Sequence, residues 1–362
     1  MIDSHAPGGY RFFNHYDEQK RGNAMRINAF VGALSIAILG ALSSSAGAAE
    51  FNARLSYHWG PKHASAAYAE RFAKEINARS KGRIDIKTFP AGQLFGIREI
   101  LGAVASGSVE IGMAVGIVSF PPLDKNYNVT AMPNLFPDFE TMRGFFSDTP
   151  EGRALWERIT SKAGVEVVGY NPVGPTALFS SLAKIDTVAS LEGAKARALV
   201  KADRPRWEVL KVSKIVSLPT NEVYTALQNG LIDTLASVPT AIFSYNWNQH
   251  LKSVQLPYYS LNDAYIIVNK GWFDALPAEL KAMVKAVGAE VSKASTDEIM
   301  SSSEQALKDF VAKGGRVDTL SPAEQAKLAK LTEQEIEPKM ADLFDASILK
   351  AAKAYVARVK KN

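Results

Sequence analysis

SLEGAKARALVKADRPRWEVLKVSKIVSLPTNEVYTALQNGLIDTLAS, residues 190–237, is the stretch that decides the fold. Three short runs, Lys195–Val200, Lys214–Leu218 and Leu231–Leu235, alternate with two segments of helical period that begin at turn or capping residues. This pattern predicts strand, helix, strand, helix, strand. We therefore expect an α/β unit in which helices connect the strands of one sheet.

The first of these strands carries an arginine, Arg197, between the small or apolar residues Ala196 and Ala198 to Val200. A guanidinium is almost never buried without a partner. If this strand is covered on both faces, Arg197 must meet a carboxylate. That carboxylate belongs either to another residue of the chain, as a structural ion pair, or to a ligand.

The chain after residue 50 predicts a second unit of the same kind. Tyr68, Phe72 and Ile76 lie on one face of a helix that follows the first strand. Short turns between the elements favour a parallel sheet, and such sheets bind ligands beyond the carboxyl ends of their strands. The expected strands are Ala53–Trp59, Arg83–Phe89 and Val109–Val115.

The second half of the chain is expected to return to the first unit. A strand at Val165–Tyr170 leads to Asn171–Pro175, whose prolines and glycine predict a crossover between two lobes. Two runs, residues 255–259 and 262–269, bring the chain back. A long helix is expected from Pro277, in its first turn, to about Lys313, and Ser321 to Glu324 form a capping box for a helical tail.

The first 48 residues are expected to be a leader. Arg26 precedes an uncharged run from Ala29 to Leu42, and Ala46-Gly47-Ala48 fits the small-residue rule for signal peptidase. The run is shorter than the roughly 20 residues that span a bilayer, although an uncleaved anchor is the alternative. We expect translation from Met25, export to the periplasm and a mature chain that begins near Ala49.

Composition excludes several classes of function. The chain has no cysteine, so it forms no disulfide and has no thiolate chemistry. The net charge is +5, and basic residues interleave with acidic ones, which argues against nucleic acid as a partner. The spacing of His58 and His63 does not suit zinc. Because nucleophile-elbow, phosphate-loop and dinucleotide motifs are missing, we expect no metal, no cofactor and no catalysis.

LEGAKAR, followed about twenty residues later by LPTNEVYTALQNGLIDT, resembles the hallmark region of the DctP-type solute-binding proteins of TRAP (tripartite ATP-independent periplasmic) transporters. RLSYHW, FAKEINARSKGRIDIKTFPAGQLFG, GSVEIGMA and MPNLF fall in order and at family-like spacing. The resemblance implies an α/β, two-lobed periplasmic binding protein fold with a long interlobe helix. Lobe I would comprise residues 49–173 plus 262–302, and lobe II residues 174–261 plus 303–362.

The function implied by the resemblance is that of a periplasmic solute receptor. Such a receptor is not an enzyme; it closes by hinge motion on a small organic carboxylate and delivers it to the membrane subunits of a TRAP permease. The family's arginine in this strand forms a two-pronged salt bridge to the ligand carboxylate, which its planar guanidinium suits, and Arg197 would inherit that role. The alternatives are an ABC-type binding protein, a sensor or scaffold, and a periplasmic hydrolase or lyase.

The cleft departs from the family's sugar-acid binders. A second arginine, about twenty residues upstream of the first, is missing, and Ser237 stands near the place of a usual asparagine. Without groups that read hydroxyls such a site discriminates polyols poorly, so we expect a monocarboxylate such as a 2-oxo, hydroxy or aromatic acid. The residues predicted to bind the ligand are Arg197, His58, Trp59, Phe95, Val115, Thr176, Phe179, Trp207, Ser237 and Phe243.

Overall fold

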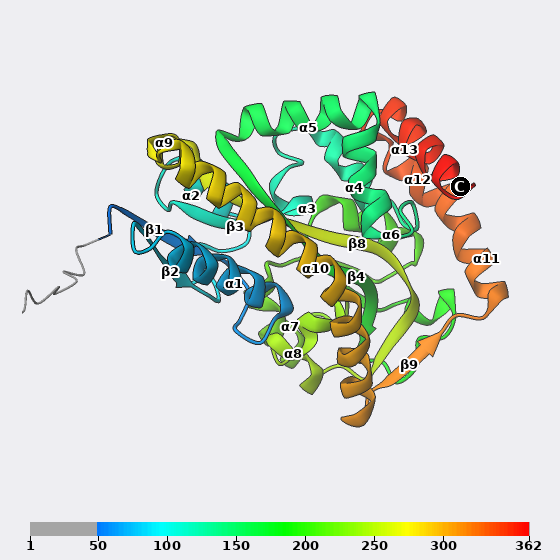
Figure 1. The fold of residues 1–362 in the computed structure, drawn as a ribbon. Helices are drawn as coiled ribbons and strands as arrows, with labels where there is room; N and C mark the ends of the chain where they lie inside the picture. Colours follow the sequence, from blue (N-terminus) through cyan, green and yellow to red (C-terminus); the bar gives the residue numbers. More distant parts are fainter. Residues whose placement is uncertain (1–48, 362) are drawn as a thin grey trace, which may run out of the picture. The chain divides into compact units, whose positions relative to one another are not determined.

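One sheet of nine strands runs through residues 49–361, the part of the chain that this computed structural model describes (Figure 1). The strand order is β2-β1-β3-β8-β4-β7-β5-β6, and β9 pairs with β8 off this path. Two parallel groups, β1 to β3 and β5 to β7, are joined by the antiparallel pair β4 and β8. The strands are β1 (Phe51–Ser56), β2 (Ile84–Phe89), β3 (Ile111–Val115), β4 (Val165–Ser180), β5 (Lys195–Ala198), β6 (Lys214–Ser217), β7 (Thr234–Ser237), β8 (Ser253–Asn269) and β9 (Arg316–Thr319).

The stretch from residue 190 to 237 forms the predicted alternation of strands and helices. Helices α6 (Arg204–Val209) and α7 (Val223–Gln228) connect three strands, and β5 pairs in parallel with both β6 and β7. The third strand begins at Thr234 and not at Leu231, which is exposed. The reason is the end of α7: Gly230 takes a left-handed φ of 63°, and the amide of Leu231 still bonds back to Ala226 O.

The first group of strands confirms the predicted parallel sheet. β1 pairs in parallel with β2 and β3. Helix α1 (Ala64–Arg79) buries Tyr68, Phe72 and Ile76 as the periodicity predicts. β1 ends at Ser56, so His58 and Trp59 lie in the loop beyond its carboxyl end, and α2 (Ile100–Ala105) precedes β3.

The strand predicted over Val165–Tyr170 does not end at Tyr170, before the crossover expected at residues 171–175. β4 continues through them to Ser180, and the two runs that bring the chain back form one strand, β8. The pairing of β4 with β8 shifts register between Pro172 and Gly174 and again between Thr176 and Leu178. Proline cannot donate to a sheet, and bulges take up the positions that lack a pairing N–H, so the strand passes its prolines without ending.

The long helix is confirmed as α10 (Ala278–Ala312), 35 residues that lie against β4 (Figure 1). Pro277, which was expected in the first turn, is the N-cap residue, so the helix begins one residue later, at Ala278. At Gly288 the helix approaches the sheet closely: a Cβ there would lie 1.9 Å from Val168 O. The Tyr68 hydroxyl donates to Ser295 O at 3.0 Å, which connects α1 with the middle of α10.

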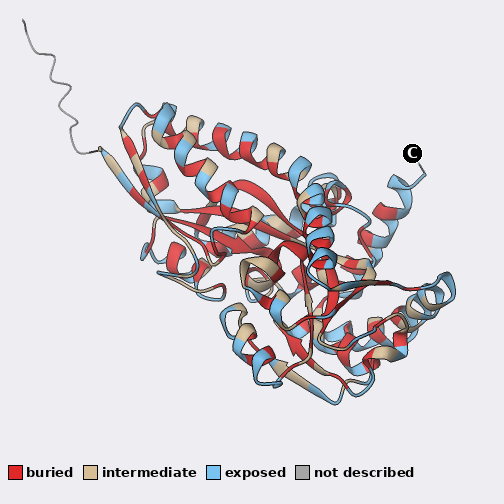
Figure 2. Ribbon diagram, turned by 90° about the horizontal axis from the view of Figure 1, so that it is seen from below, coloured by how far each residue is buried: buried red, intermediate tan, exposed pale blue. Residues whose placement is uncertain are grey.

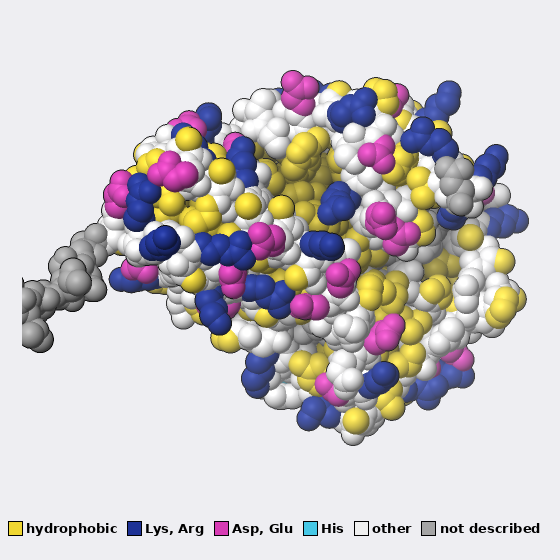
Figure 3. All heavy atoms as spheres, viewed as in Figure 1, with side chains coloured by type: hydrophobic (Ala, Val, Ile, Leu, Met, Phe, Trp, Pro, Cys, Tyr) yellow, Lys and Arg dark blue, Asp and Glu magenta, His cyan; other side chains and the backbone are white. Residues whose placement is uncertain are grey.

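Charged side chains are interleaved on the face formed by α1 and α10 (Figure 3). Arg71 pairs with Glu298 at 3.2 Å, and Arg79 pairs with Glu290 at 2.6 Å. Exposed ion pairs such as these contribute little stability, typically about 0–1 kcal/mol each. These basic side chains have acidic neighbours, so the positive and negative charges on this face offset each other.

The remaining helices cover the sheet, whose strands are mostly buried (Figure 2). Ser321 caps α11, accepting from the Glu324 amide at 3.3 Å. The Glu324 carboxylate accepts from the Val188 amide instead of the Ser321 amide, so only half of the predicted capping box forms. Within residues 49–361 no helix is both long enough and apolar enough to cross a membrane. The remaining helices are α3 (Gly116–Ser119), α4 (Phe139–Asp148), α5 (Pro150–Ala163), α8 (Pro239–Ser244), α9 (Lys270–Ala275), α11 (Pro322–Leu331), α12 (Glu337–Lys339) and α13 (Ala346–Val359).

The proposed lobe boundaries fall where β4 and β8 pass between the two parallel groups. β3 pairs with the last part of β8, and β7 pairs with the last part of β4. Gly174 and Asn262, the residues at which the lobes would exchange, are paired with each other across these two strands. The division of the chain at these points stays a prediction. The predicted leader and its cleavage site lie outside the described residues.

Candidate ligand-binding site

A small cavity of about 60 Å³ lies at the carboxyl ends of strands from both parallel groups. Val115 ends β3, Arg197 lies in β5 and Ser237 ends β7, so the sheet itself positions these three lining residues. Sheets of this kind bind ligands at that edge. Loops and turns around the sheet add further polar and aromatic lining residues, among them His58, Trp59, His63, Thr220, Tyr245, Trp247 and Asn262.

Arg197 is buried, with 3% of its surface exposed. Its Nε donates to Leu218 O at 3.1 Å and its Nη2 to Thr220 Oγ1 at 3.3 Å. No carboxylate among residues 49–361 lies within ion-pair distance, so no structural ion pair forms there. Burial lowers the pKa of Arg197 to about 10, against the opposing effect of Asp203. A buried cation without a counter-ion favours an anion in the cavity.

The strand end that carries Arg197 is fixed by two neighbouring side chains. Asp203 accepts through Oδ2 from the amides of Leu199, at 2.8 Å, and Val200, at 3.1 Å. Its carboxylate therefore holds the turn after β5. Trp207 is completely buried, and its Nε1 donates to Arg197 O at 2.9 Å. Trp207 lies beneath the site as a support and does not line the cavity.

The two histidines of the cavity are held neutral. His63 Nδ1 accepts from the Ser65 amide at 3.0 Å, which caps α1 and leaves the proton on Nε2, 3.3 Å from Thr240 Oγ1. Burial lowers the pKa of His63 to about 3. Burial also holds the pKa of His58 well below its ordinary value, with His63 and Arg197 adding to the effect. Arg197 is therefore the charged side chain of the cavity lining.

Five of the predicted ligand-binding residues meet at the cavity: His58, Trp59, Val115, Arg197 and Ser237. The other five lie outside the lining. Thr176 does not line the cavity but contacts a residue that does: its Oγ1 accepts at 3.1 Å from Nδ2 of Asn262. Phe179 is buried and packs edge-on against Phe310. Phe95 and Phe243 are half-buried against hydrophobic clusters, and Trp207 supports Arg197.

Tyr245 and Trp247, aromatic residues beside turns that the sequence places facing the cleft, are not among the predicted ligand-binding residues, yet they form an aromatic wall of the cavity after α8. The rings of Tyr245 and Trp247 stack at 5.0 Å, and both line the cavity. Tyr245 also donates to the backbone oxygen of His58 at 3.2 Å. The signal in the sequence was the aromatic cluster SYNWNQH after the third strand of the central stretch. Nothing in the sequence pattern distinguished Trp247, which lines the cavity, from Phe243, which does not.

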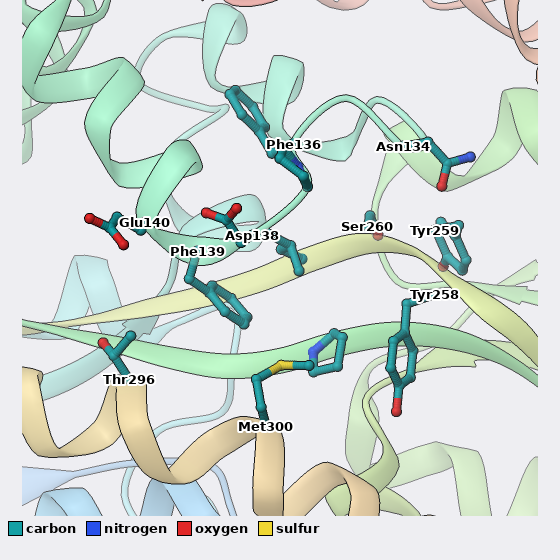
Figure 4. A pocket seen from close by; sticks show the side chains of 13 residues that line it. Asn134, Phe136, Asp138, Phe139, Glu140, Tyr258, Tyr259, Ser260, Thr296 and Met300 are labelled. Carbon is teal, nitrogen blue, oxygen red and sulfur yellow. The ribbon is translucent and has the colours of Figure 1, made fainter. Parts of the chain in front are cut away.

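A larger pocket of about 370 Å³ lies elsewhere, between α4, β8 and α10 (Figure 4). Its aromatic and apolar walls include Phe139, Tyr258 and Met300. The charged side chains that line it are two carboxylates, Asp138 and Glu140, with no basic residue beside them in the described lining. Such a pocket repels a carboxylate ligand, so its greater size does not make it the better candidate.

Apart from Arg197, the titratable side chains of the cavity lining are His58, His63 and Tyr245. Its lining, drawn from residues 49–361, contains no carboxylate. The buried Asp263 has a pKa raised to about 6 by burial, against hydrogen bonds from Tyr265 and Tyr127, but it does not line the cavity. The same part of the chain holds no cluster of three metal-binding side chains.

Two parallel groups joined by crossing strands, with an anion-favouring cavity between them, define a solute-binding protein of the periplasmic type. The family model for bacterial extracellular solute-binding protein, family 7, matches residues 55–342, and the chain belongs to that family. Its members are transport receptors and not enzymes. The resemblance to DctP-type proteins is thereby confirmed.

Individual relatives agree with the family. The 2,3-diketo-L-gulonate-binding periplasmic protein YiaO of Escherichia coli is 26% identical over 263 residues, 71% of this chain and 77% of that protein. A TRAP periplasmic solute binding protein from Shewanella oneidensis with bound succinate has a TM-score of 0.77 at 20% identity, over 84% of this chain and 99% of that one. The pyroglutamic acid receptor DctP7 of Bordetella pertussis has a TM-score of 0.75 at 19% identity, again over 84% and 99%. These likenesses confirm the two-lobed α/β fold.

Proposed function

We propose that this protein is a periplasmic receptor that binds a small organic monocarboxylate and delivers it to the membrane subunits of a TRAP permease. The observation that carries the proposal is Arg197, a buried guanidinium at the edge of a cavity with no carboxylate partner among residues 49–361. Its fixed fork of donors suits the two oxygens of a carboxylate.

Electrostatics restricts the ligand to one negative charge. Arg197 is the charged residue in the lining of the described cavity, and both histidines there are neutral at pH 7. A second carboxylate would be buried without a counter-charge, which costs several kcal/mol. The relatives carry different acids: a diketo sugar acid, succinate and pyroglutamic acid. Their common feature is a carboxylate, which is the part that Arg197 would bind here.

Contacts around the cavity explain how a bound ligand would be retained. Tyr245, after α8, donates to the backbone of His58, and His63 bonds to Thr240 in α8. Arg98 reaches from the loop before α2 to Leu199 O at 3.1 Å and Ser217 Oγ at 3.4 Å. These bonds join the two parallel groups over the site. A ligand that contacts both groups would stabilise this closed arrangement over an open one.

The test is a thermal-shift screen of mono- and dicarboxylates, followed by calorimetry on the acids that stabilise the protein. A ligand at 100 times its Kd stabilises by about 2.7 kcal/mol. Arg197→Lys keeps the charge but loses the planar fork, and we expect it to cost about 2–5 kcal/mol of binding. Arg204→Lys, at an exposed position in α6, is the matched control. Unchanged affinity in a folded Arg197→Lys protein would reject the proposal.

A further inference from the structure

Arg98 bridges the two parallel groups of strands at the lining of the cavity. It lies in the loop before α2, and its Nη2 donates to Leu199 O at 3.1 Å and to Ser217 Oγ at 3.4 Å. Leu199 follows β5, and Ser217 is the last residue of β6. Ile97, the chain neighbour of Arg98, lines the cavity, and so does the acceptor residue Leu199. The bridge therefore connects the two groups beside the space that a ligand would occupy.

The two sides of this bridge differ in how firmly they are held. On the acceptor side, the amide of Leu199 donates to Asp203 Oδ2 at 2.8 Å, and Ser217 is part of the sheet. On the donor side, the Arg98 side chain is exposed, and no carboxylate among residues 49–361 lies within ion-pair distance of it. Its bonds go to two neutral oxygens, so Arg98 can leave them without separating an ion pair.

The positive charge of Arg98 makes the bridge sensitive to an anion in the cavity. Burial lowers the pKa of Arg197 to about 10, and the charge of Arg98 adds to this effect, against the opposing effect of Asp203. Like charges repel each other, and they do so more strongly where the protein excludes water. In the ligand-free protein, the bridge brings a second cation towards the buried Arg197. A carboxylate bound to Arg197 would cancel this repulsion.

We infer that Arg98 is a latch that closes over a bound anion: its two bonds hold the parallel groups together, and the negative charge of the ligand determines whether they form. This inference rests on the proposed function and adds the regulation of the same site. Arg98 does not line the cavity, so it is a positioning residue that acts on the ligand through the closed arrangement. The quantity that it controls is the dissociation rate, in which most affinity differences between related complexes lie.

Spin labels on the purified ligand-free protein test whether an anion closes the latch. The chain contains no cysteine, so Ala78→Cys in α1 and Gln228→Cys in α7, both at exposed positions, place one label beside each parallel group. Acetate is the probe, because it carries one carboxylate and is small enough for a cavity of about 60 Å³. Acetamide, of the same shape without the charge, is the control. The distance between the labels should become shorter and more uniform with acetate and should not change with acetamide.

Variants of Arg98 then measure the latch through the rate of ligand release. Stopped-flow fluorescence of Trp59 and Trp247, which line the cavity, follows the loss of acetate on dilution. Arg98→Gln removes the charge and should release acetate about 10-fold faster than the wild type, because hydrogen bonds from a charged donor are lost. Arg98→Lys keeps the charge and should stay within about 3-fold of the wild type. Arg204→Gln, at an exposed position in α6, has the same net charge as Arg98→Gln and should not change the rate.

A second set of variants separates the latch from a merely structural role. Ser217→Ala removes one acceptor and should accelerate release about 2-fold in the wild type, with no further effect in Arg98→Gln, since both changes open the same bridge. The urea midpoint of each ligand-free variant should match that of the wild type, because both side chains are exposed. Additive rates, or a lower midpoint for Arg98→Gln, would indicate a structural role and overturn the inference.

The remaining outcomes separate this inference from the proposed function. If Arg98→Gln releases acetate at the wild-type rate while Arg197→Lys abolishes binding, the receptor binds carboxylates through Arg197 and the latch alone is wrong. The latch is also wrong if Arg98→Gln changes only the association rate, or if the labels show the closed distance without any ligand. If acetate changes neither the distance nor the fluorescence of the wild type, the inference is wrong, and the wider screen of acids decides the proposed function separately.

Discussion

Replacing Arg197 with methionine is expected to stabilise the ligand-free protein and to abolish its response to ligand. Burial lowers the pKa of Arg197 from 12.5 to about 10, which corresponds to about 3 kcal/mol. For a base, a lower pKa in the folded state means that the charged form is less favourable there than in the unfolded chain. At neutral pH the guanidinium therefore opposes folding, and removing the charge removes that cost.

Lost hydrogen bonds offset part of this gain. Arg197 donates to Leu218 O and to Thr220 Oγ1, and losing these bonds costs about 1–2 kcal/mol in total. Methionine fills a similar volume with an unbranched apolar chain, which adapts to irregular spaces. The net effect is a stabilisation of about 1–2 kcal/mol, in the direction seen when buried charges are replaced by apolar residues.

Urea unfolding of ligand-free protein measures this difference as a shift in midpoint at constant slope. The exposed Arg204→Met variant is the control and should stay within about 0.5 kcal/mol of the wild type. Saturating ligand should stabilise the wild type and not Arg197→Met. The reasoning is refuted if Arg197→Met unfolds at a lower urea concentration than the wild type, or if it keeps the stabilisation by ligand.

Three further predictions concern other parts of the chain. Burial raises the pKa of Asp263 from 3.8 to about 6, so stability from its protonated form is complete below about pH 4 and is lost as the pH rises through 6. The free energy of unfolding of Asp263→Asn, relative to that of the wild type, should therefore increase by about 3 kcal/mol between pH 4 and pH 7. Urea unfolding measures this difference, and a difference that does not change with pH would contradict the prediction. Gly288→Ala should destabilise by about 1–3 kcal/mol, because its Cβ would collide with Val168 O. Thermal unfolding should show the opposite sign for Gly102→Ala in α2, where a Cβ meets no atom within 4 Å. Protein recovered from the periplasm should begin at or next to Ala49, and an N-terminal sequence that starts at Met1 or Met25 would reject cleavage.

The elements that the sequence predicted well are those whose period and end signals agree. Tyr68, Phe72 and Ile76 mark one helical face, and Ser321 caps α11, so both helices were predicted correctly in type. The strand that passes Pro172 and Pro175 was predicted to end before them, because local propensity treats proline as a breaker. Pairing with β8 and the bulges overrode that propensity, and neither is visible in a single sequence.

The same distinction holds for the candidate site. Arg197 could be singled out because a charge among small strand residues conflicts with its surroundings, and that conflict is local. The residues alone left a structural ion pair and a ligand carboxylate open as its partner, and the resemblance to the family favoured the ligand. Trp247 could not be selected, because an aromatic side chain beside a turn packs into a core or lines a cavity without any change in the sequence pattern. Trp207 shows the difficulty: it is buried beneath the site and reaches it only through its bond to Arg197 O.

β4 and β8 join the two parallel groups, β8 by pairing with β3 and β4 by pairing with β7, and this has a consequence for how the protein can be divided. A fragment cut at Gly174 and Asn262 would have half of each crossing strand, and the freed edges would present unpaired backbone groups ready to pair with other chains. Neither half is therefore a module that evolution or an engineer can transplant by simple excision. Recombination between relatives should succeed with both crossing strands from one parent, and swaps of single helices or loops at the periphery should be tolerated more readily than exchange of a whole lobe.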